Sequence, residues 1–155
     1  MYEYSRKLID QFLKEGNSKD KHIYFRFVAI WIAFNHWLVV KFQKDSDGEL
    51  LKEFYKGYAD YFKKEVNLNA NLKESIKKLS EKTPVHDERP THRNDTKKID
   101  TLDDLKQVFG VIYLIRCNLM HGSKRFDASR DDELVNLSHN ILNKLFTKLI
   151  GEEYV

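Results

Sequence analysis

The sequence predicts one all-α domain over residues 1–155, built as an antiparallel bundle of about five to six helices. Apolar residues recur with the 3.6-residue period of a helix along most of the chain. No segment alternates apolar and polar residues as a half-buried strand would, and only two prolines and six glycines supply turns. A length of 155 residues with 41% hydrophobic residues is typical of a single globular domain.

Each expected helix combines an apolar stripe with a polar boundary. Gly16 terminates the first helix, and the second helix is the most apolar. The third has the broadest aromatic stripe, and the fourth has the shortest apolar stripe. The fifth begins at a capping box formed by Thr101 and Asp104. The sixth begins with acidic residues, which suit the positive end of a helix. We expect these helices over residues 2–14, 21–43, 48–64, 71–82, 101–121 and 131–150, with the second and fifth at the centre.

The second expected helix contains a nearly continuous apolar run from Phe27 to Val40. The run is shorter than the roughly 20 residues that span a membrane, and it includes Asn35 and His36. We therefore interpret it as a buried helix. The N-terminus lacks the apolar stretch of a signal peptide, and the single Cys117 cannot form an internal disulfide. These features favour a cytoplasmic protein with no membrane contact.

The overall charge does not indicate a binding partner. The formal net charge is +3, from 27 basic and 24 acidic residues, which is too balanced to identify a nucleic-acid-binding protein. Any phosphate site must therefore come from local placement. The sequence contains no zinc-ligand cluster, no glycine-rich phosphate loop and no Ser–His–Asp arrangement, so we expect no metal and no cofactor.

Residues 83–100 form the one long polar segment, and it contains both prolines. Loops of this length are uncommon and are usually functional or disordered. The segment carries a basic group whose charge is largely cancelled by acidic neighbours, so we interpret it as a solvated loop. The basic group is His86, Arg89, His92 and Arg93, and the acidic neighbours are Asp87, Glu88 and Asp95.

The most informative stretch is Arg116 to Gly122, at the polar end of an otherwise apolar helix. Arginine suits phosphate and histidine titrates near neutral pH, so the two could act on a phosphodiester without a metal. Positions five apart on an ideal helix are separated by about 140°, so Arg116 and His121 do not share a face, whereas Asn118 and His121 do. Arg116 and His121 can meet if the helix ends at His121, with Gly122 as a left-handed cap, or if a second chain brings its own motif. The structural alternative is that both residues complement the negative end of the helix.

Two stretches resemble the HEPN superfamily, small helical domains defined by an Arg-x4–6-His motif. Arg116-Cys117-Asn118-Leu119-Met120-His121-Gly122-Ser123-Lys124 is similar to the R-N-N-L-F-H-G-G-K form of one branch. Ala29-Ile30-Trp31-Ile32-Ala33-Phe34-Asn35 is similar to the W-x-A-F-N helix that often precedes the motif in that branch. The sequence departs from the pattern at Cys117, Met120 and Ser123, and none of these departures removes a reacting group.

The resemblance implies a metal-independent endoribonuclease that acts on RNA as a homodimer. In that scheme Arg116, Asn118 and His121 are catalytic, and Asn35 orients Arg116 or Asn118 from across the bundle. The setting would be a toxin–antitoxin, defence or RNA-processing system, with an antitoxin or regulatory protein as a further partner. The alternative is a non-catalytic HEPN-like module that binds nucleotides or proteins.

Three residues after the motif histidine complete the expected substrate-binding set: Gly122, Lys124 and Arg125. Lys124 and Arg125 would hold flanking phosphates, or they form an ordinary solvated basic loop.

Overall fold

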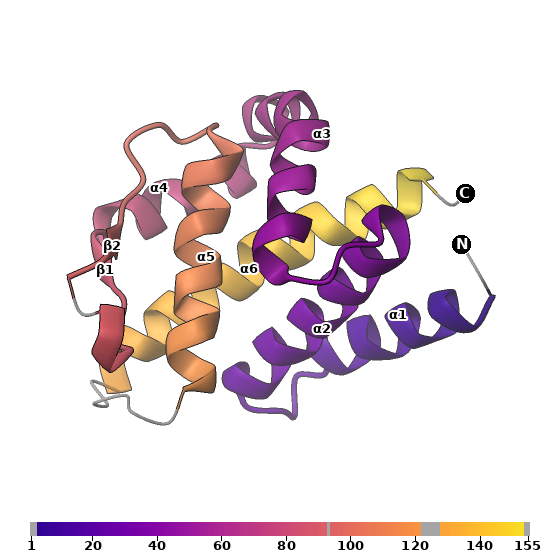
Figure 1. The fold of residues 1–155 in the computed structure, drawn as a ribbon, viewed down its shortest axis with the longest axis horizontal. Coiled ribbons are helices and arrows are strands. Elements are labelled where there is room, and N and C mark those ends of the chain that lie inside the picture. The colour runs from indigo at the N-terminus through magenta and orange to yellow at the C-terminus, as the bar shows by residue number, and fades with distance from the viewer. Residues whose placement is uncertain (1–2, 93, 122–127, 154–155) are drawn as a thin grey trace.

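The computed structural model describes residues 3–92, 94–121 and 128–153. Within these ranges the chain forms six α-helices, one short 3-10 helix and two short strands, so the predicted all-α class is confirmed (Figure 1). The elements in order are α1 (Glu3–Gly16), α2 (Ile23–Phe42), α3 (Asp47–Leu68), α4 (Ala70–Glu81), β1 (Val85–His86), η1 (Pro90–His92), β2 (Thr96–Lys97), α5 (Leu105–Met120) and α6 (Ala128–Glu153).

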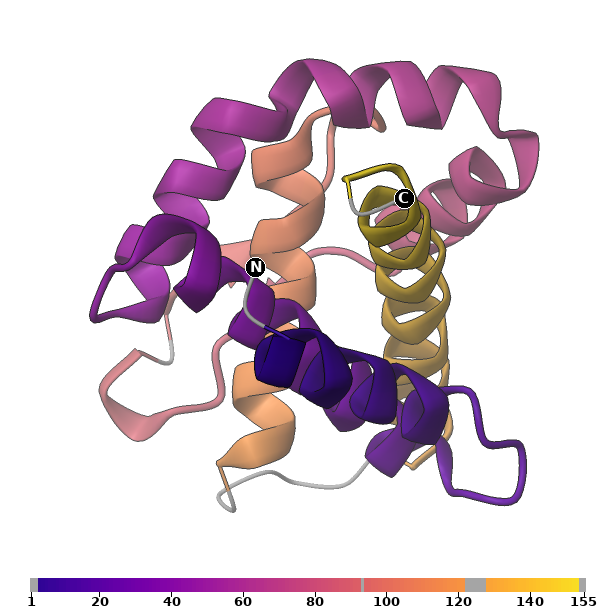
Figure 2. The same ribbon diagram turned by 90° about the vertical axis from the view of Figure 1, so that its right-hand side faces the viewer.

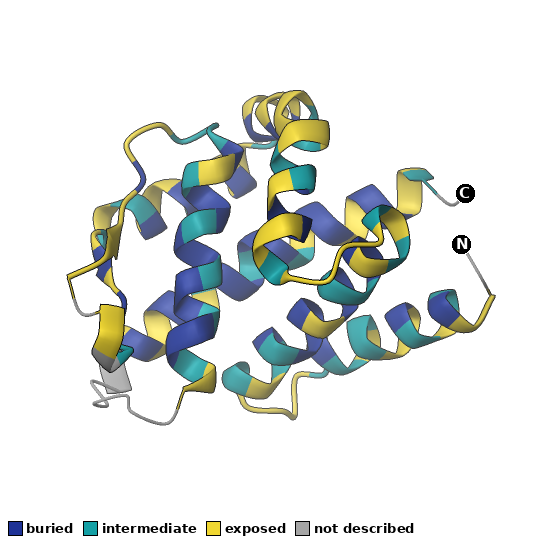
Figure 3. Cartoon of the chain, in the orientation of Figure 1, coloured by how far each residue is buried: buried dark blue, intermediate teal, exposed yellow. Residues whose placement is uncertain are grey.

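The helices pack around a core rich in aromatic rings. Phe34 of α2 lies at its centre, where its ring contacts the rings of Phe54 in α3, Phe109 in α5 and Phe146 in α6. The helix α2 packs against α1, α3 and α6, and α5 packs against α3, α6 and both strands. Figure 2 shows α3 passing over one end of α5 and α6, while α4 turns down beside α6. The buried surfaces of α2 and α5 face inward (Figure 3).

The helix α2 lies within the predicted range 21–43 and extends beyond the apolar run at both ends. It spans 20 residues, and among the described residues it is the one helix with the length and apolar composition to cross a membrane. Its inner side chains nevertheless lie in the bundle, since Phe27, Ile30 and Trp37 are fully buried. Burial within the bundle is what a core helix requires.

The predicted start of α5 was wrong by one turn. The helix begins at Leu105, after Asp104, whose carboxylate accepts a hydrogen bond from the Gln107 backbone N–H at 3.1 Å. The Gln107 side chain in turn accepts from the backbone N–H groups of Asp100 and Thr101, each at 2.9 Å. Asp104 is thus the N-cap, and the Gln107 side chain binds the turn before it instead of closing a reciprocal capping box, because the Asp104 N–H donates to the Thr101 carbonyl at 3.2 Å. Thr101 is not the capping residue.

The polar segment before α5 is more structured than a solvated loop. The strands β1 and β2 pair antiparallel, with Val85 opposite Lys97 and His86 opposite Thr96, so the expectation of no sheet failed for this short ladder. Val85 and Ile99 are buried, which ties the segment to the core. The segment therefore lies against α5 and brings its polar side chains to that helix.

Candidate functional site

The helix carrying the Arg-x4-His motif ends at Met120, and His121 is its C-cap. The His121 backbone is extended, with φ −94° and ψ 115°, and its N–H donates to the Cys117 carbonyl at 3.0 Å. His121 is exposed to solvent at the end of the helix. Gly122, which was expected to cap the helix, lies outside the described residues, as do Lys124 and Arg125.

Arg116 lies one turn before the end of α5 and is held in place by its neighbours. One guanidinium nitrogen, Nη1, lies 3.8 Å from Oδ2 of Asp47, at the start of α3. The guanidinium carbon lies 5.9 Å from the ring centre of Trp31 and 6.0 Å from that of Tyr113, within cation–π range. Its side chain keeps 26% of its surface exposed. Arg116 is therefore oriented by the fold and still reachable by a ligand.

Asp47 joins three helices at this point. Its Oδ1 accepts a hydrogen bond from the Asn35 side-chain amide at 3.2 Å, and its Oδ2 accepts from the Tyr113 hydroxyl at 3.5 Å. Burial raises the pKa of Tyr113 to about 12, with Cys117 and Asp47 adding to the rise, so the phenol stays protonated and can donate. Asn35 thus reaches Arg116 through Asp47, which the sequence reasoning missed. The signal available was an acidic residue in the first turn of a helix, and such residues are common there for other reasons.

Asn118 serves the neighbouring segment rather than the end of the helix. Its side chain is 3% exposed, and its Nδ2 donates to the His86 carbonyl at 2.8 Å. Its Oδ1 accepts from the Glu88 backbone N–H at 3.0 Å. These bonds attach β1 to α5. Among the described residues, no recorded contact joins Asn118, Arg116 and His121 to one another.

A cavity of about 530 Å³ lies between the polar segment and α5. We call it the Arg89 pocket. Its lining comes from residues 87–97 on one side and from one face of α5 on the other. The side chains used below are Asp87, Arg89, His92, Asp95, Lys97 and Tyr113, and Gly110 and Cys117 also contribute to its wall.

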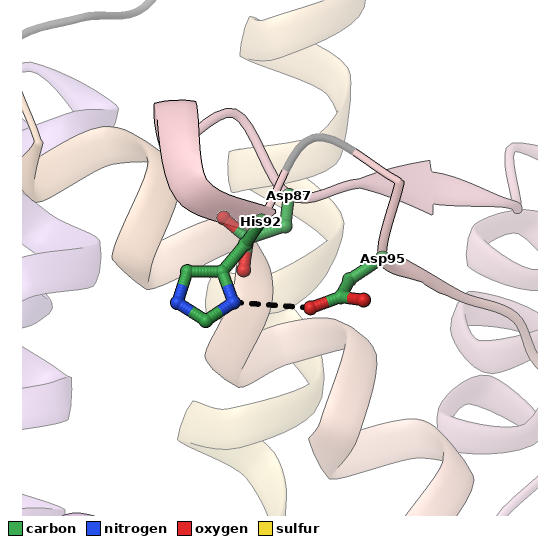
Figure 4. Close-up of side chains that lie close together, drawn as sticks. All are labelled: Asp87, His92 and Asp95. Atoms are coloured by element: carbon green, nitrogen blue, oxygen red, sulfur yellow. Dashed lines mark hydrogen bonds and ion pairs between the residues drawn. The ribbon is translucent and has the colours of Figure 1, made fainter.

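One ion pair and one hydrogen bond between side chains order the Arg89 pocket. Arg89 binds the buried Asp87 carboxylate in a two-point contact, Nε to Oδ1 at 3.0 Å and Nη2 to Oδ2 at 2.5 Å. The hydrogen bond from Arg89 holds the pKa of Asp87 below its usual range, and the same bond raises the pKa of Arg89. The His92 Nδ1 lies 3.1 Å from Oδ2 of Asp95 (Figure 4).

The same three side chains are close enough to be considered for a metal. One ligand atom from each of Asp87, His92 and Asp95 lies within 4.8 Å of the others. Carboxylate and imidazole suit several divalent ions. Both Asp87 oxygens already accept hydrogen bonds from Arg89, however, so a cation would have to displace a guanidinium. The donor set therefore fits a metal poorly.

Comparison with protein-family models, with curated proteins and with solved structures finds no match to this chain. The resemblance to the HEPN superfamily accordingly depends on the two motif-bearing stretches alone, one on α2 and one on α5. The contacts of Asp47 with Asn35 and with Arg116 connect those two stretches in space.

Proposed function

We propose that this protein is a HEPN-like endoribonuclease that cleaves RNA without a metal. The observation that carries the proposal is the placement of Arg116, which Asp47 and two aromatic rings orient at the accessible end of α5, one turn before the exposed His121. A fixed cation and an exposed imidazole at the same end of a helix suit phosphodiester chemistry.

The reaction uses the 2′-hydroxyl that distinguishes RNA from DNA. His121 accepts the 2′-hydroxyl proton, the 2′-oxygen bonds to phosphorus, and the bond from phosphorus to the 5′-oxygen breaks. The leaving 5′-oxygen takes up a proton, so the products are a 2′,3′-cyclic phosphate and a 5′-hydroxyl. Arg116 stabilises the negative charge that develops on the phosphate oxygens.

A homodimer supplies the second proton-transfer group in this scheme. His121 of one copy acts as base, and the same residue of the second copy protonates the leaving oxygen. Exposed apolar side chains support such an association: Phe25 and Ile32 on α2 are 73% and 38% exposed, and Met120 beside the motif is 53% exposed. Light scattering on the purified protein would give twice the chain mass if the dimer forms.

The proposed setting is cytoplasmic, in a toxin–antitoxin, defence or RNA-processing system. An antitoxin or other regulatory protein would then restrain the nuclease. A second candidate function, a non-catalytic HEPN-like nucleotide- or protein-binding module, is favoured by one observation. Both hydrogen-bonding groups of the Asn118 side chain are used inside the protein, which leaves this motif residue without a direct part in chemistry.

Asp47 provides the sharpest test that the charge arrangement matters. In this proposal Asp47 is a positioning residue that acts through Arg116. Asp47→Asn keeps the size of the side chain and removes its charge. We expect kcat for RNA cleavage to fall about tenfold with little change in KM, because misplacing a transition-state group costs rate more than binding. The melting temperature reports any structural loss separately.

A matched control lies in the same first turn of α3. Glu49 is exposed and its side chain has no recorded hydrogen bond or ion pair among the described residues, so Glu49→Gln should leave kcat unchanged. Equal kcat values for Asp47→Asn and wild type would refute the positioning role. Equal losses in both variants would indicate a general charge effect instead.

A further inference from the structure

We propose that the Arg89 pocket binds a phosphate of the RNA strand next to the one being cleaved, with Arg89 and Lys97 as its ligands. This inference rests on the proposed function, since it assigns a second subsite to the same substrate. The sequence-based interpretation of residues 83–100 as a solvated loop assigns no ligand to this segment.

Arg89 is prepared for an anion by its pairing with Asp87. The contact with Asp87 uses Nε and Nη2, and leaves Nη1 without a recorded partner among the described residues. A guanidinium held on one edge loses less entropy when its other edge binds a phosphate. The surrounding backbone is also ordered, because the Arg89 carbonyl accepts from the His92 N–H at 2.9 Å and the Asp95 carbonyl accepts from the Asp87 N–H at 2.9 Å.

Lys97 adds a cation that no carboxylate neutralises in the part of the chain that the structure describes. It lies on β2, exposed, with no ion pair recorded for its ammonium. Its aliphatic stem passes over Gly110 of α5, and a Cβ built on Gly110 would lie 4.0 Å from Lys97 Cδ. A glycine inside a helix is less stable than alanine, and here it leaves the floor of the pocket open.

The free hydrogen-bond donors of the pocket favour an anion over a cation. Arg89 compensates the Asp87 carboxylate, and Lys97 has no ion pair among the described residues. The Nδ1–H of His92 donates to Asp95, so Nε2 of the neutral ring is an acceptor and does not donate to a phosphate. A phosphodiester would accept hydrogen bonds from Arg89 and Lys97. A metal ion would instead meet a guanidinium and an ammonium.

The Arg89 pocket adjoins the surroundings of Arg116. Tyr113 and Cys117 line the pocket, the Tyr113 hydroxyl donates to Asp47, and Arg116 Nη1 lies 4.0 Å from Cys117 Sγ. Asn118 attaches the polar segment to the same end of α5. A strand whose reacting phosphate lies at Arg116 would therefore place a neighbouring phosphate near Arg89 and Lys97.

Binding of single-stranded RNA tests the inference independently of cleavage. The experiment uses the full-length His121→Ala protein, a short labelled RNA and EDTA, with fluorescence anisotropy measured over a range of salt concentrations. We expect Lys97→Gln to weaken binding about three- to tenfold and to lower the salt slope by about 0.7, the value for one phosphate contact on a single strand. The control is Lys98→Gln, because Lys98 is the next residue, is exposed, and lies 3.6 Å from Asp100.

Arg89→Lys is the second variant, since it keeps the charge beside Asp87 and removes the planar fork. We expect it to weaken RNA binding as Lys97→Gln does. Equal affinity and slope for Lys97→Gln and Lys98→Gln would overturn the inference. RNA binding by the His121→Ala protein that is lost in EDTA and restored by Mn²⁺ or Zn²⁺ would also overturn it, because it would assign the carboxylates to a metal.

Inorganic phosphate and a mononucleotide separate the two sources of a phosphate group. If either binds with a Lys97-dependent affinity while RNA binding does not depend on Lys97, the pocket takes a free phosphate ligand and the strand subsite is refuted. If Lys97→Gln weakens RNA binding but the protein does not cleave RNA, the phosphate subsite is supported. Only the proposed nuclease activity is then refuted.

Discussion

Replacing Asn118 with alanine should destabilise the protein substantially, although the residue is small and lies near a helix end. The side chain is 3% exposed and makes two hydrogen bonds to the backbone of the polar segment, at 2.8 Å and 3.0 Å. The substitution leaves the His86 carbonyl and the Glu88 N–H without these partners. Each unsatisfied buried group costs about 1–3 kcal/mol, and partial access of water at His86 lowers the sum to about 2–4 kcal/mol.

That loss is large against the roughly 5–15 kcal/mol by which domains are usually stable. Urea denaturation followed by circular dichroism measures it. Asn136→Ala is the control, because Asn136 is exposed on α6 and its side chain has no recorded hydrogen bond among the described residues. The control should lie within about 0.5 kcal/mol of wild type. An Asn118→Ala protein as stable as Asn136→Ala would refute the reasoning.

Further predictions concern a buried histidine and two glycines. His139 is 2% exposed and donates from Nε2 to the Gly16 carbonyl at 2.7 Å, and burial holds its pKa below the ordinary 6.5. Below pH 6.5 the unfolded chain therefore binds more protons than the folded one, so the unfolding free energy should fall as the pH drops from 6.5 toward the folded-state pKa. Thermal melts from pH 7.5 to 5 should show this decline, with a smaller decline in His139→Gln; identical slopes would contradict it. Gly16→Ala should cost about 1–3 kcal/mol, because the new Cβ would overlap the Ile30 side chain and approach the Arg26 carbonyl oxygen to 3.0 Å. Gly57→Ala should instead raise the unfolding free energy by about 0.5–1 kcal/mol, since nothing lies within 4 Å of that position inside α3. Calorimetry that gives both alanine variants the same sign would rule this out.

The helices could be predicted from sequence because their apolar residues recur with a local period. The start of α5 shows where local signals compete. Thr101 and Asp104 have capping-box spacing. The side chains that accept from backbone N–H groups at this helix start are nevertheless those of Asp104 and Gln107. Which N–H groups they reach depends on the path of the chain before α5. The ladder between β1 and β2 is too short to produce an alternating pattern.

The site was only partly predictable for a similar reason. The motif identified Arg116 and His121, and it also identified Asn118, whose observed partners lie in the polar segment. The role of Asp47 depends on how α2, α3 and α5 cross, which no local pattern encodes. The Arg89 pocket likewise requires a segment of mixed charge to lie against α5, where pairing determines which charges are left free.

If Arg116 and His121 cleave RNA without a metal, as we propose, the end groups of the products will show it. Purified protein should convert single-stranded RNA in EDTA to fragments with 2′,3′-cyclic phosphate and 5′-hydroxyl ends. His121→Ala should abolish these products, whereas His86→Ala, at an exposed histidine on β1, should retain them. Products with 5′-phosphate ends, cleavage that EDTA abolishes, or unchanged cleavage by His121→Ala would each contradict the claim.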